Sequence, residues 1–317
     1  MDEAKPVAVV TGASRGLGFL LARELGRCGH DLVVCARSAE GLAAARPDLE
    51  ATGATVDTVV CDVSVAADVA RLVDTATARH GRIDVLVNNA GTIQVGPVGA
   101  MRAEQFADAL GVMLWGVVHP TLAVLPLLRS RGCGRIVNIT SIGGKIPAPH
   151  LLPYTTAKFA AVGFSEGLRA ELAKDGISVT TAVPGLMRTG SPRNALFSGD
   201  RTAEHRWFAL GDSLPLVSMD AERAARRIVD GALRGRPEII LTPAAKLAVR
   251  AHGLAPGLTT RAAALVDRLL PRGEDAPPVP GHTVDPDPPQ WFRVLTTLTD
   301  RAARRWHQHD DEARQPR

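Results

Sequence analysis

The chain has 317 residues, of which 45% are hydrophobic and 22% charged, and its formal net charge is +4. This composition is close to that of ordinary globular proteins and excludes a collagen, a disulfide-rich miniprotein, a coiled coil and a mostly disordered chain. Aromatic residues make up only 4% and include a single tyrosine. The core must therefore be filled by Ala, Val and Leu, and the lone tyrosine becomes a candidate for chemistry.

The distribution of charge and of cysteines indicates which partners and which cellular compartment to expect. The basic residues are nearly all arginines spread along the chain, without a basic block, so the sequence does not indicate nucleic-acid binding. The four cysteines show neither a C-x-x-C pair nor metal-ligand spacing, and Cys35 and Cys61 lie in apolar runs typical of core residues. The N-terminal residues lack the pattern of a signal peptide. We therefore expect a cytoplasmic protein without a bound metal.

Short apolar runs alternate with helical patterns over residues 1–242. Strands are predicted at 7–11, 32–36, 55–61, 83–88, 135–140, 178–183 and 238–241. Helices are predicted at 16–28, 39–52, 66–80, 103–128, 153–174 and 220–234. Several strands are continuously apolar, as in strands buried on both faces. The alternation predicts an α/β fold with a doubly wound parallel sheet, of the Rossmann type, forming one dinucleotide-binding and catalytic domain.

One apolar segment is long enough to suggest a membrane span. Residues 110–128 carry no formally charged side chain. They include His119, Pro120 and Pro126, which are poor residues for a span. The segment is therefore predicted to be a buried helix.

The pattern changes after residue 242. Residues 243–270 predict a helical extension, residues 271–290 a proline-rich linker, and residues 291–317 an amphipathic helix followed by a polar tail. One face of the last helix carries Phe292, Leu295, Leu298, Ala302 and Trp306. The extension is expected to fold back on the core or on a partner, and contact with a membrane surface is the less favoured alternative.

A glycine-rich loop follows the first predicted strand directly. Residues 11–18 read TGASRGLG, and a helix follows. Glycines allow a tight turn and let backbone N–H groups approach a pyrophosphate at the helix N-terminus. The loop predicts a dinucleotide site, with an ordinary glycine-rich turn as the alternative. Its candidate cofactor residues are Gly12, Ser14, Arg15, Gly16, Leu17 and Gly18.

The end of the second strand favours NADP(H) over NAD(H). An NAD site has an acidic residue near this position for the ribose 2′-hydroxyl, whereas here Ala36 is followed by Arg37. Arg37 and Arg15 could clamp a 2′-phosphate, although either alone could be an ordinary surface residue. Asp62 and Val63 follow the third strand and are placed either to meet the adenine or to cap a helix.

Polar residues collect where predicted strands end, which is where open α/β sheets bind ligands. Ser141 ends the fifth strand, and Tyr154 and Lys158 share one helix face, four residues apart. A phenol can protonate the alkoxide formed by hydride transfer if a cation brings its pKa down toward neutrality. Tyr154 is therefore predicted as the acid/base, Lys158 as its activator and Ser141 as the anchor of the substrate oxygen.

The order and spacing of the motifs strongly resemble the short-chain dehydrogenase/reductase family over roughly residues 5–242. The matching motifs are TGASRGLG at 11–18, DV at 62–63, NNAG at 88–91, Ser141, YTTAK at 154–158 and PGLMRT at 184–189. The resemblance implies a seven-stranded sheet of order 3-2-1-4-5-6-7, a nicotinamide cofactor and a homodimer or tetramer. It also implies cofactor contacts from Asn89, Ala90, Gly91, Tyr154, Lys158, Pro184, Gly185 and Thr189.

One position departs from the family pattern. Met113 stands where the family usually has an Asn that is thought to kink the helix and hold a water linked to the lysine, and methionine does neither well. Either His119 or another group relays protons, or turnover is slow. The main hypothesis is an NADP(H)-dependent oxidoreductase that interconverts a carbonyl and an alcohol. The alternative is an NADP(H)-binding regulatory or scaffold protein with weak catalysis.

The expected substrate pocket is apolar. Its walls should come from residues 92–100, 142–152 and 186–217, which are rich in aliphatic and aromatic side chains. This favours a hydrophobic or bulky small-molecule substrate. His150, Arg188 and Arg193 could contact a substrate, but ordinary loop or surface roles are the favoured interpretation.

Overall fold

The computed structural model describes residues 5–214, 218–273 and 276–308. Expectations for residues 1–4, 215–217, 274–275 and 309–317, including the polar end of the chain, lie outside this part.

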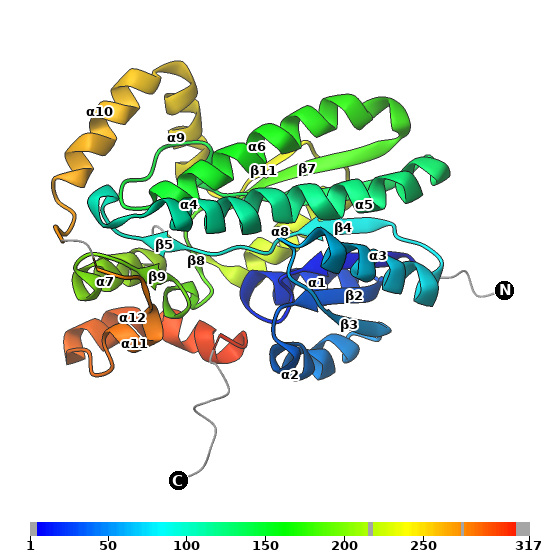
Figure 1. Ribbon diagram of the computed structural model, residues 1–317, viewed down its shortest axis with the longest axis horizontal. Coiled ribbons are helices and arrows are strands. Elements are labelled where there is room, and N and C mark those ends of the chain that lie inside the picture. Colours follow the sequence, from blue (N-terminus) through cyan, green and yellow to red (C-terminus); the bar gives the residue numbers. More distant parts are fainter. Residues whose placement is uncertain (1–4, 215–217, 274–275, 309–317) are drawn as a thin grey trace, which may run out of the picture.

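Seven parallel strands form the central sheet in the order β3-β2-β1-β4-β6-β7-β11 (Figure 1). Counted along the chain, this is the implied order 3-2-1-4-5-6-7, so the doubly wound Rossmann-type fold is confirmed. The predicted strands are all present, with ends displaced by at most two residues. They are β1 (Val7–Thr11), β2 (Asp31–Ala36), β3 (Val56–Val60), β4 (Val85–Asn88), β6 (Gly134–Ile139), β7 (Ile177–Val183) and β11 (Glu238–Ile240).

Side chains of the strands alternate between two cores, one on each face of the sheet. Ala8 and Val10 of β1 join the core that contacts α1, α2 and α8, whereas Val7 and Val9 join the core that contacts α3, α5 and α6. Because helices cover both faces, the strands must be apolar throughout. The helices are α1 (Gly16–Arg27), α2 (Ala39–Glu50), α3 (Ala66–His80), α5 (Gly116–Arg131), α6 (Leu152–Leu172) and α8 (Ala221–Leu233).

The apolar segment 110–128 lies in a continuous helical stretch against the sheet. Ala103–Arg131 is the one helix among the described residues that is long and apolar enough to cross a membrane. It consists of α4 (Ala103–Leu110), a π-helical turn (Gly111–Trp115) and α5. Val117, Val124 and Leu128 are buried, and the last two join the core between helices and sheet. The segment is thus helical, as predicted, but only one side of it is buried, because Trp115 and Leu122 are exposed.

The segment after residue 185 adds elements that the sequence pattern did not predict. Helix α7 (Arg201–Ser213) lies in a stretch expected only as pocket wall. The proline-rich segment 271–290 contributes β12, which pairs with β9 in a three-stranded sheet completed by β5. The short strands and turns are β5 (Gln94–Val95), β8 (Met187–Arg188), β9 (Leu196–Phe197), β10 (Met219–Asp220), β12 (Val279–Pro280), η1 (Val98–Ala100), η3 (Ile142–Gly144), η4 (Ala173–Asp175) and η5 (Ser191–Arg193).

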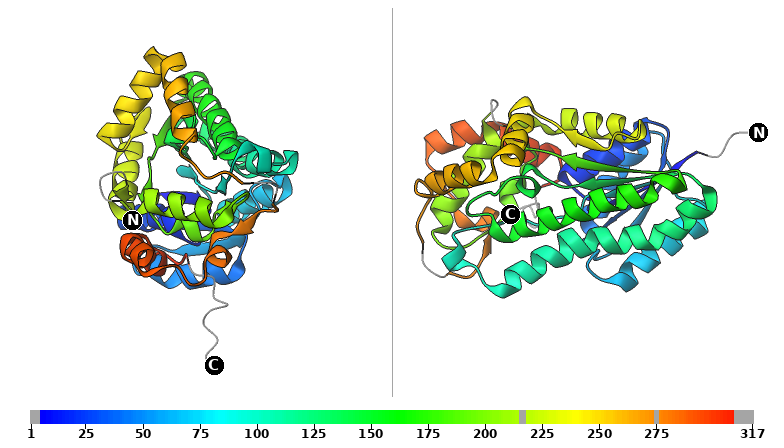
Figure 2. Two further views of the ribbon diagram at one scale, coloured as in Figure 1. Left: turned by 90° about the vertical axis from the view of Figure 1, so that its left-hand side faces the viewer. Right: turned by 90° about the horizontal axis from the view of Figure 1, so that it is seen from above.

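The C-terminal extension follows two different courses (Figure 2). Helices α9 (Pro243–Leu254) and α10 (Pro256–Asp267) form a hairpin that rises from the body, drawn in yellow and orange. Helix α11 (Gly281–Val284) and helix α12 (Gln290–Arg305) instead pack against α7. The second half of the extension therefore folds back on the core of its own chain, whereas the hairpin buries only Ala245.

The buried face of α12 differs from the predicted one. Phe292 and Trp306 are buried as expected, but Leu295 and Leu298 are 47% and 41% exposed. Thr296, Thr299 and Ala303 are buried in their place. The hydroxyl of Ser213 on α7 donates to Oγ1 of Thr299 at 2.7 Å, and Gly190 lacks the Cβ atom that would clash with Ala303. Small and hydroxyl-bearing residues thus set this helix contact, which hydrophobicity alone could not reveal.

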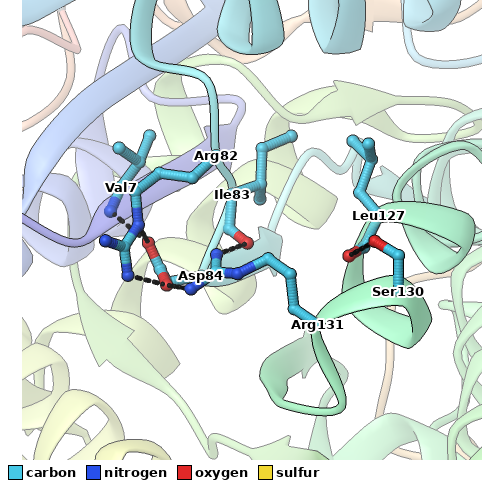
Figure 3. Close-up of polar contacts among 7 residues, drawn as sticks. All are labelled: Val7, Arg82, Ile83, Asp84, Leu127, Ser130 and Arg131. Atoms are coloured by element: carbon cyan, nitrogen blue, oxygen red, sulfur yellow. Dashed lines mark hydrogen bonds and ion pairs between the residues drawn. The ribbon is translucent and has the colours of Figure 1, made fainter.

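At the amino ends of the strands, Asp84 joins three elements (Figure 3). Its carboxylate accepts hydrogen bonds from the backbone N–H of Val7 at 2.8 Å and from Arg82 at 2.7 and 2.8 Å. Arg131 lies 2.9 Å from the same carboxylate and also donates to the carbonyl of Ile83. Burial alone would raise the pKa of Asp84, but the hydrogen bonds from Arg82, Val7 and Arg131 outweigh it and lower the pKa overall. This contact therefore ties β1, β4 and the end of α5 together.

Asp84→Asn is expected to reduce the free energy of unfolding at pH 7 by about 2 kcal/mol, because it removes a charge-assisted network. Folding lowers the pKa of Asp84. Its contribution to the free energy of unfolding is therefore fully present when the pH is above 3.8, the ordinary pKa of aspartate, and is lost as the pH falls through the lower pKa of the folded state. Urea unfolding from pH 7 to pH 3 measures the difference. Asp108→Asn at an exposed position is the control, and an equal effect of both variants would contradict the prediction.

Candidate active site

The glycine-rich loop forms a tight cradle between β1 and α1. Gly12 has a φ of +64°, and a Cβ atom there would lie 2.8 Å from Cα of Ala90. A Cβ atom on Gly18 would lie 2.1 Å from the carbonyl oxygen of Gly12 and 2.3 Å from Nδ2 of Asn89. Only glycine fits these positions, so the loop presents the bare backbone that a pyrophosphate site requires. The residues present therefore fit a dinucleotide cofactor.

Asn89 ties this cradle to the end of β4. Its Nδ2 donates to the carbonyls of Thr11 and Gly12 at 3.1 and 3.2 Å. In return, Oγ1 of Thr11 accepts the backbone N–H groups of Asn89 and Ala90 at 2.9 and 3.1 Å. Gly91 follows directly. The structure thus brings the TGASRGLG loop after β1 next to the NNAG motif after β4. This was predicted, because both motifs follow the carboxyl ends of strands.

The C-terminal turn lies on the same loop, and the sequence analysis missed this contact. The N–H of Gly16 donates to the carbonyl of Trp306 at 2.8 Å. Gln308 is buried, and its Nε2 would lie 2.5 Å from a Cβ atom on Gly16. Nδ2 of Asn194 donates to Oε1 and to the carbonyl oxygen of Gln308 at 2.7 and 3.2 Å. No motif marks this turn, because the contact joins opposite ends of the chain.

Arg15 and Arg37 lie at the same edge of the sheet. Arg15 is the residue before the first turn of α1, and Arg37 is exposed directly after β2. Because β1 and β2 are parallel neighbours, their carboxyl ends lie side by side. Ser14 and Leu17 complete the loop on the β1 side, with Cβ of Ser14 3.2 Å from a Cβ atom built on Gly41.

Asp62 and Val63 occupy the turn after β3. Oδ1 of Asp62 accepts hydrogen bonds from the backbone N–H and the hydroxyl of Ser64 at 2.9 and 2.7 Å. Val63 packs against α5, where a Cβ atom on Gly116 would lie 2.5 Å from its Cγ2. The carboxylate of Asp62 therefore stabilises the local turn and does not cap α3, whose N-cap residue is Val65.

Ser141, Tyr154 and Lys158 come together at the carboxyl ends of β6 and β7. Oγ of Ser141 accepts the N–H of Gly143 at 3.1 Å, and a side-chain hydrogen bond joins Ser141 to Tyr154. Nζ of Lys158 lies 5.8 Å from the ring centroid of Tyr154 and donates to the carbonyl of Ile139 at 2.9 Å. The three predicted residues thus form one cluster around the phenol.

The pKa of the phenol differs in direction from the prediction. Burial raises the pKa of Tyr154 to about 12, the hydrogen bond with Ser141 opposes this, and the nearby carboxylate of Asp212 adds to it. Burial also lowers the pKa of Lys158 to about 8. Lys158 therefore does not lower the pKa of Tyr154 in this arrangement, because its ammonium group is itself costly to bury.

Met113 lies in the π-helical turn Gly111–Trp115, fully buried against Ala109, Ala157 and Tyr154. The helix is interrupted by a π turn at Met113 although no Asn stands there. Nδ1 of His119 lies 3.3 Å from the carbonyl of Val63. That contact provides no proton route from His119 to Lys158.

The PGLMRT segment is held beside this cluster. The carbonyl of Pro184 accepts the N–H of Ile142, and Oγ1 of Thr189 accepts the N–H of Ser191 at 3.2 Å. Gly185 lies between them in the chain. Arg188 donates to the carbonyl and hydroxyl of Ser218 at 2.6 and 3.1 Å, so its guanidinium has a structural role. The carbonyl of Arg193 meets Nδ1 of His282 at 3.2 Å.

Part of the expected pocket wall forms a small core of its own. Val95 and Phe197 are fully buried, and Phe208 of α7 packs with them. His150 is buried with a φ of +60°, and its Nδ1 lies 2.6 Å from the fully buried carboxylate of Glu204. Nε1 of Trp207 donates to the other carboxylate oxygen at 2.6 Å. His150 therefore fastens α7 to the loop before Tyr154, and this buried structural role was not predicted, since the sequence favoured an ordinary loop histidine.

Asp212 on α7 is a candidate site residue that the sequence analysis missed. Its side chain is buried and accepts a hydrogen bond from the hydroxyl of Ser191 at 2.8 Å. Burial raises its pKa to about 7, against the effect of that hydrogen bond. Its charge also influences Tyr154. Nothing in the local sequence distinguishes it from a surface acid on a helix, because its position depends on how α7 packs.

Asp212→Asn is expected to increase the free energy of unfolding at pH 8, on the order of 3 kcal/mol, because it removes a buried negative charge. Folding raises this pKa from 3.8 to about 7, so the unfavourable contribution grows as the pH rises between these values. The increase in the free energy of unfolding should become smaller as the pH is lowered toward 4. Urea unfolding across this range measures it, with exposed Asp108→Asn as control. A pH-independent difference would contradict the assignment.

Comparisons with known proteins agree with this architecture. A family model described as short chain dehydrogenase matches residues 6–196. The chain is 41% identical over 185 residues to a putative ketoacyl reductase of Streptomyces coelicolor, covering 58% of this chain and 71% of the relative.

Two solved structures are similar over most of the chain. A short-chain dehydrogenase/reductase from Burkholderia phymatum in complex with NAD has a TM-score of 0.74 and 28% identity, covering 81% of this chain and 96% of that one. A variant of actinorhodin polyketide ketoreductase with NADPH has a TM-score of 0.66 and 32% identity, covering 75% and 95%. By motif order, sheet topology and similarity, this chain belongs to the short-chain dehydrogenase/reductase family of oxidoreductases.

Proposed function

We propose that the protein is a cytoplasmic, NADP(H)-dependent oxidoreductase that interconverts a carbonyl and an alcohol on a hydrophobic or bulky small molecule. The observation that carries this proposal is the cluster of Ser141, Tyr154 and Lys158 beside a glycine cradle that fits a dinucleotide. The free state of all four cysteines supports a reducing compartment.

In this proposal each residue of the cluster has one task. A bound nicotinamide supplies or accepts the hydride. The hydroxyl of Ser141 hydrogen-bonds the substrate oxygen, and Tyr154 gives its phenolic proton to that oxygen in the reduction or takes it back in the oxidation. Lys158, whose pKa burial lowers to about 8, does not lower the pKa of Tyr154 here, and its task in the proposal is to hydrogen-bond the ribose of the cofactor.

Arg37→Asp is expected to weaken NADPH binding by about a hundredfold and NADH binding far less, because it removes a guanidinium partner of the 2′-phosphate and adds a like charge. Fluorescence titration of both nucleotides measures the ratio. Arg71→Asp, at a surface position on α3, is the control. An equal loss for both nucleotides would reject the 2′-phosphate role of Arg37.

The substrate class follows from the apolar wall and from the relatives. Ile93, Leu151 and Trp207 are partly exposed apolar residues packed around the small core, and the Streptomyces relative is a putative ketoacyl reductase. A panel of hydrophobic cyclic and β-keto carbonyl compounds, followed by NADPH oxidation, tests the proposal. Turnover of small polar ketones alone would contradict the substrate class.

A second candidate function rests on Met113. An apolar side chain packs against Tyr154 where the family usually has an Asn, which favours a nucleotide-binding protein with weak catalysis. Tight NADPH binding without turnover of any carbonyl compound in the panel would favour this alternative. Met113→Asn should then raise turnover if proton supply is the missing step.

A homodimer or tetramer is also part of the proposal. Trp115, Leu122 and Phe159 are exposed on the π turn, α5 and α6, which form the outer layer on one face of the sheet. Apolar side chains on one surface support a self-association face. Light scattering gives the assembly size, and a monomer at micromolar concentration would contradict this part.

A further inference from the structure

The α9–α10 hairpin leaves an apolar stripe without a partner in the described chain. Leu258, Leu265 and Leu269 are spaced by seven and four residues, so they lie on one side of α10 and the turn that continues it. They are 69%, 59% and 85% exposed, and no residue of α10 is buried. A soluble surface rarely carries such a stripe without a binding role.

The stripe faces away from the body of the protein. Asp267 is nine positions from Leu258, which places it on the opposite side of the helix. Its carboxylate lies 3.6 Å from Nε2 of the buried His150, so that side of α10 meets the body. The leucines therefore point outward from the raised hairpin that Figure 2 shows.

Positive charge borders the stripe. Arg261 and Arg268 each follow a leucine of the stripe by three positions, so they lie along its edge. Across 243–272 the basic residues outnumber the acidic ones five to one. A second copy that met this surface through a two-fold axis would place like charges together. A stripe of leucines bordered by arginines instead matches a surface that is both apolar and anionic.

We propose that the α9–α10 hairpin docks on an anionic lipid surface, with its leucines in the acyl region and its arginines at the headgroups. The docked face would lie on the far side of α10 from the loop of His150, which is four residues before Tyr154, so only the thickness of one helix would separate that loop from the lipid. Docking would thus bring the loop before Tyr154 close to the membrane. The inference does not depend on the proposed reaction.

Vesicle co-sedimentation of the full chain tests the proposal, with phosphatidylglycerol vesicles compared with neutral phosphatidylcholine vesicles. We expect binding to the anionic vesicles only, weakening with salt. Replacing all three leucines by serine, or both arginines by glutamate, should reduce binding at least about tenfold. Leu298→Ser, which changes an exposed leucine of α12 outside the hairpin, should not. Thermal melting confirms that the variants fold.

Two results would overturn the proposal. One is the absence of binding to anionic vesicles, or binding that neither hairpin variant reduces. The other is a leucine variant that dissociates a dimer in light scattering while vesicle binding stays unchanged, since the occupant would then be a second copy.

An independent observation concerns the C-terminal turn Trp306–Gln308. The carbonyl of Trp306 accepts the N–H of Gly16 at the start of α1, where a pyrophosphate would also need N–H donors. Asn194 holds Oε1 of Gln308, which turns Nε2 of that amide toward Gly16. The turn therefore covers the phosphate end of the proposed cofactor site.

The turn is attached by one buried aromatic side chain, Trp306, and by several weaker contacts. The ring of Trp306 lies 6.5 Å from that of Phe19, and the guanidinium of Arg23 lies 5.0 Å from it. The ring of His307 meets Phe19 edge-on at 4.8 Å, and its Nε2 lies 3.1 Å from Asp48 of α2. The contacts of His307 and Arg23 are individually weak, so opening of the turn as a local unfolding step depends mainly on whether Trp306 leaves its buried position.

We infer that the turn Trp306–Gln308 is a latch that must open for the dinucleotide to enter and leave. This inference rests on the proposed nucleotide binding. Stopped-flow fluorescence gives the association and dissociation rates of NADPH. Trp306→Ala and Gln308→Ala should raise both rates about fivefold or more, and Leu298→Ala on the exposed side of α12 should raise neither.

The outcomes separate the latch from the proposed function. If the wild-type chain binds no nicotinamide nucleotide, the proposed function fails and the latch with it. If it binds, but both variants fold and leave the rates unchanged, only the latch is wrong. A faster dissociation without faster association would make the turn a fixed wall of the site and would also overturn the latch.

Discussion

Replacing Tyr154 by phenylalanine should lower the turnover of a carbonyl substrate by about 10²–10⁴-fold while NADPH still binds. The change removes the hydroxyl that hydrogen-bonds Ser141 and leaves the ring in place. No other phenol exists in the chain to take over, since Tyr154 is the single tyrosine. Steady-state NADPH oxidation and fluorescence titration measure the two effects separately.

Thr156→Val is a suitable control for this experiment. Thr156 lies two residues away on the exposed side of α6, and its hydroxyl donates only to the carbonyl of Leu152 in its own helix. Its turnover should match that of the unchanged protein. Full activity of the Tyr154 variant would reject the acid/base role, and a parallel loss of NADPH binding would show that the tyrosine acts by shaping the cofactor site.

Gly18→Ala is expected to weaken nucleotide binding by about a hundredfold and to reduce the free energy of unfolding by about 2 kcal/mol. The added methyl group would lie 2.1 Å from the carbonyl oxygen of Gly12 and 2.3 Å from Nδ2 of Asn89. The first of these is backbone and the second is fixed by hydrogen bonds to Thr11 and Gly12, so neither can move easily. The clash can be relieved only if the glycine-rich loop moves away from Asn89. NADPH titration and urea unfolding measure both effects.

The chain offers a matched glycine for comparison. Gly163 lies in α6 at an exposed position, and a Cβ atom there meets nothing within 4 Å. Gly163→Ala should therefore increase stability by up to about 1 kcal/mol, because alanine is the better helix former. Equal behaviour of the two alanine variants would show that the cradle tolerates a side chain.

The strand ends and the motifs were predictable because their causes are local. Continuous apolar runs such as Val7–Thr11 predict buried parallel strands, and glycines at the start of a helix predict a phosphate loop. Tyr154 and Lys158 were predictable as a pair because the helix repeat places residues four apart on one face. These inferences need no knowledge of distant contacts.

The features that the sequence did not predict depend on contacts between elements that are distant in the chain. Thr296, Thr299 and Ala303 form the buried face of α12 because α7 and Gly190 offer it hydroxyl groups and space, and neither condition is visible in the hydrophobic pattern of α12. Asp212 has an ordinary helical context but becomes buried when α7 packs. The rise in the pKa of Tyr154 likewise follows from burial and from Asp212, which only the assembled site defines.

The sequence by itself determined the parallel α/β sheet, the loop that fits a dinucleotide and the Tyr154–Lys158 pair, since each follows from residue type and spacing along the chain, whereas the strand order came from the family resemblance. Tertiary structure alone decided what the C-terminal extension does. It placed Trp306 and Gln308 on Gly16 and left Leu258, Leu265 and Leu269 in solvent. Helices with similar apolar faces can either pack on the protein or leave those faces in solvent. The outcome depends on whether the folded chain offers a complementary surface for the apolar face.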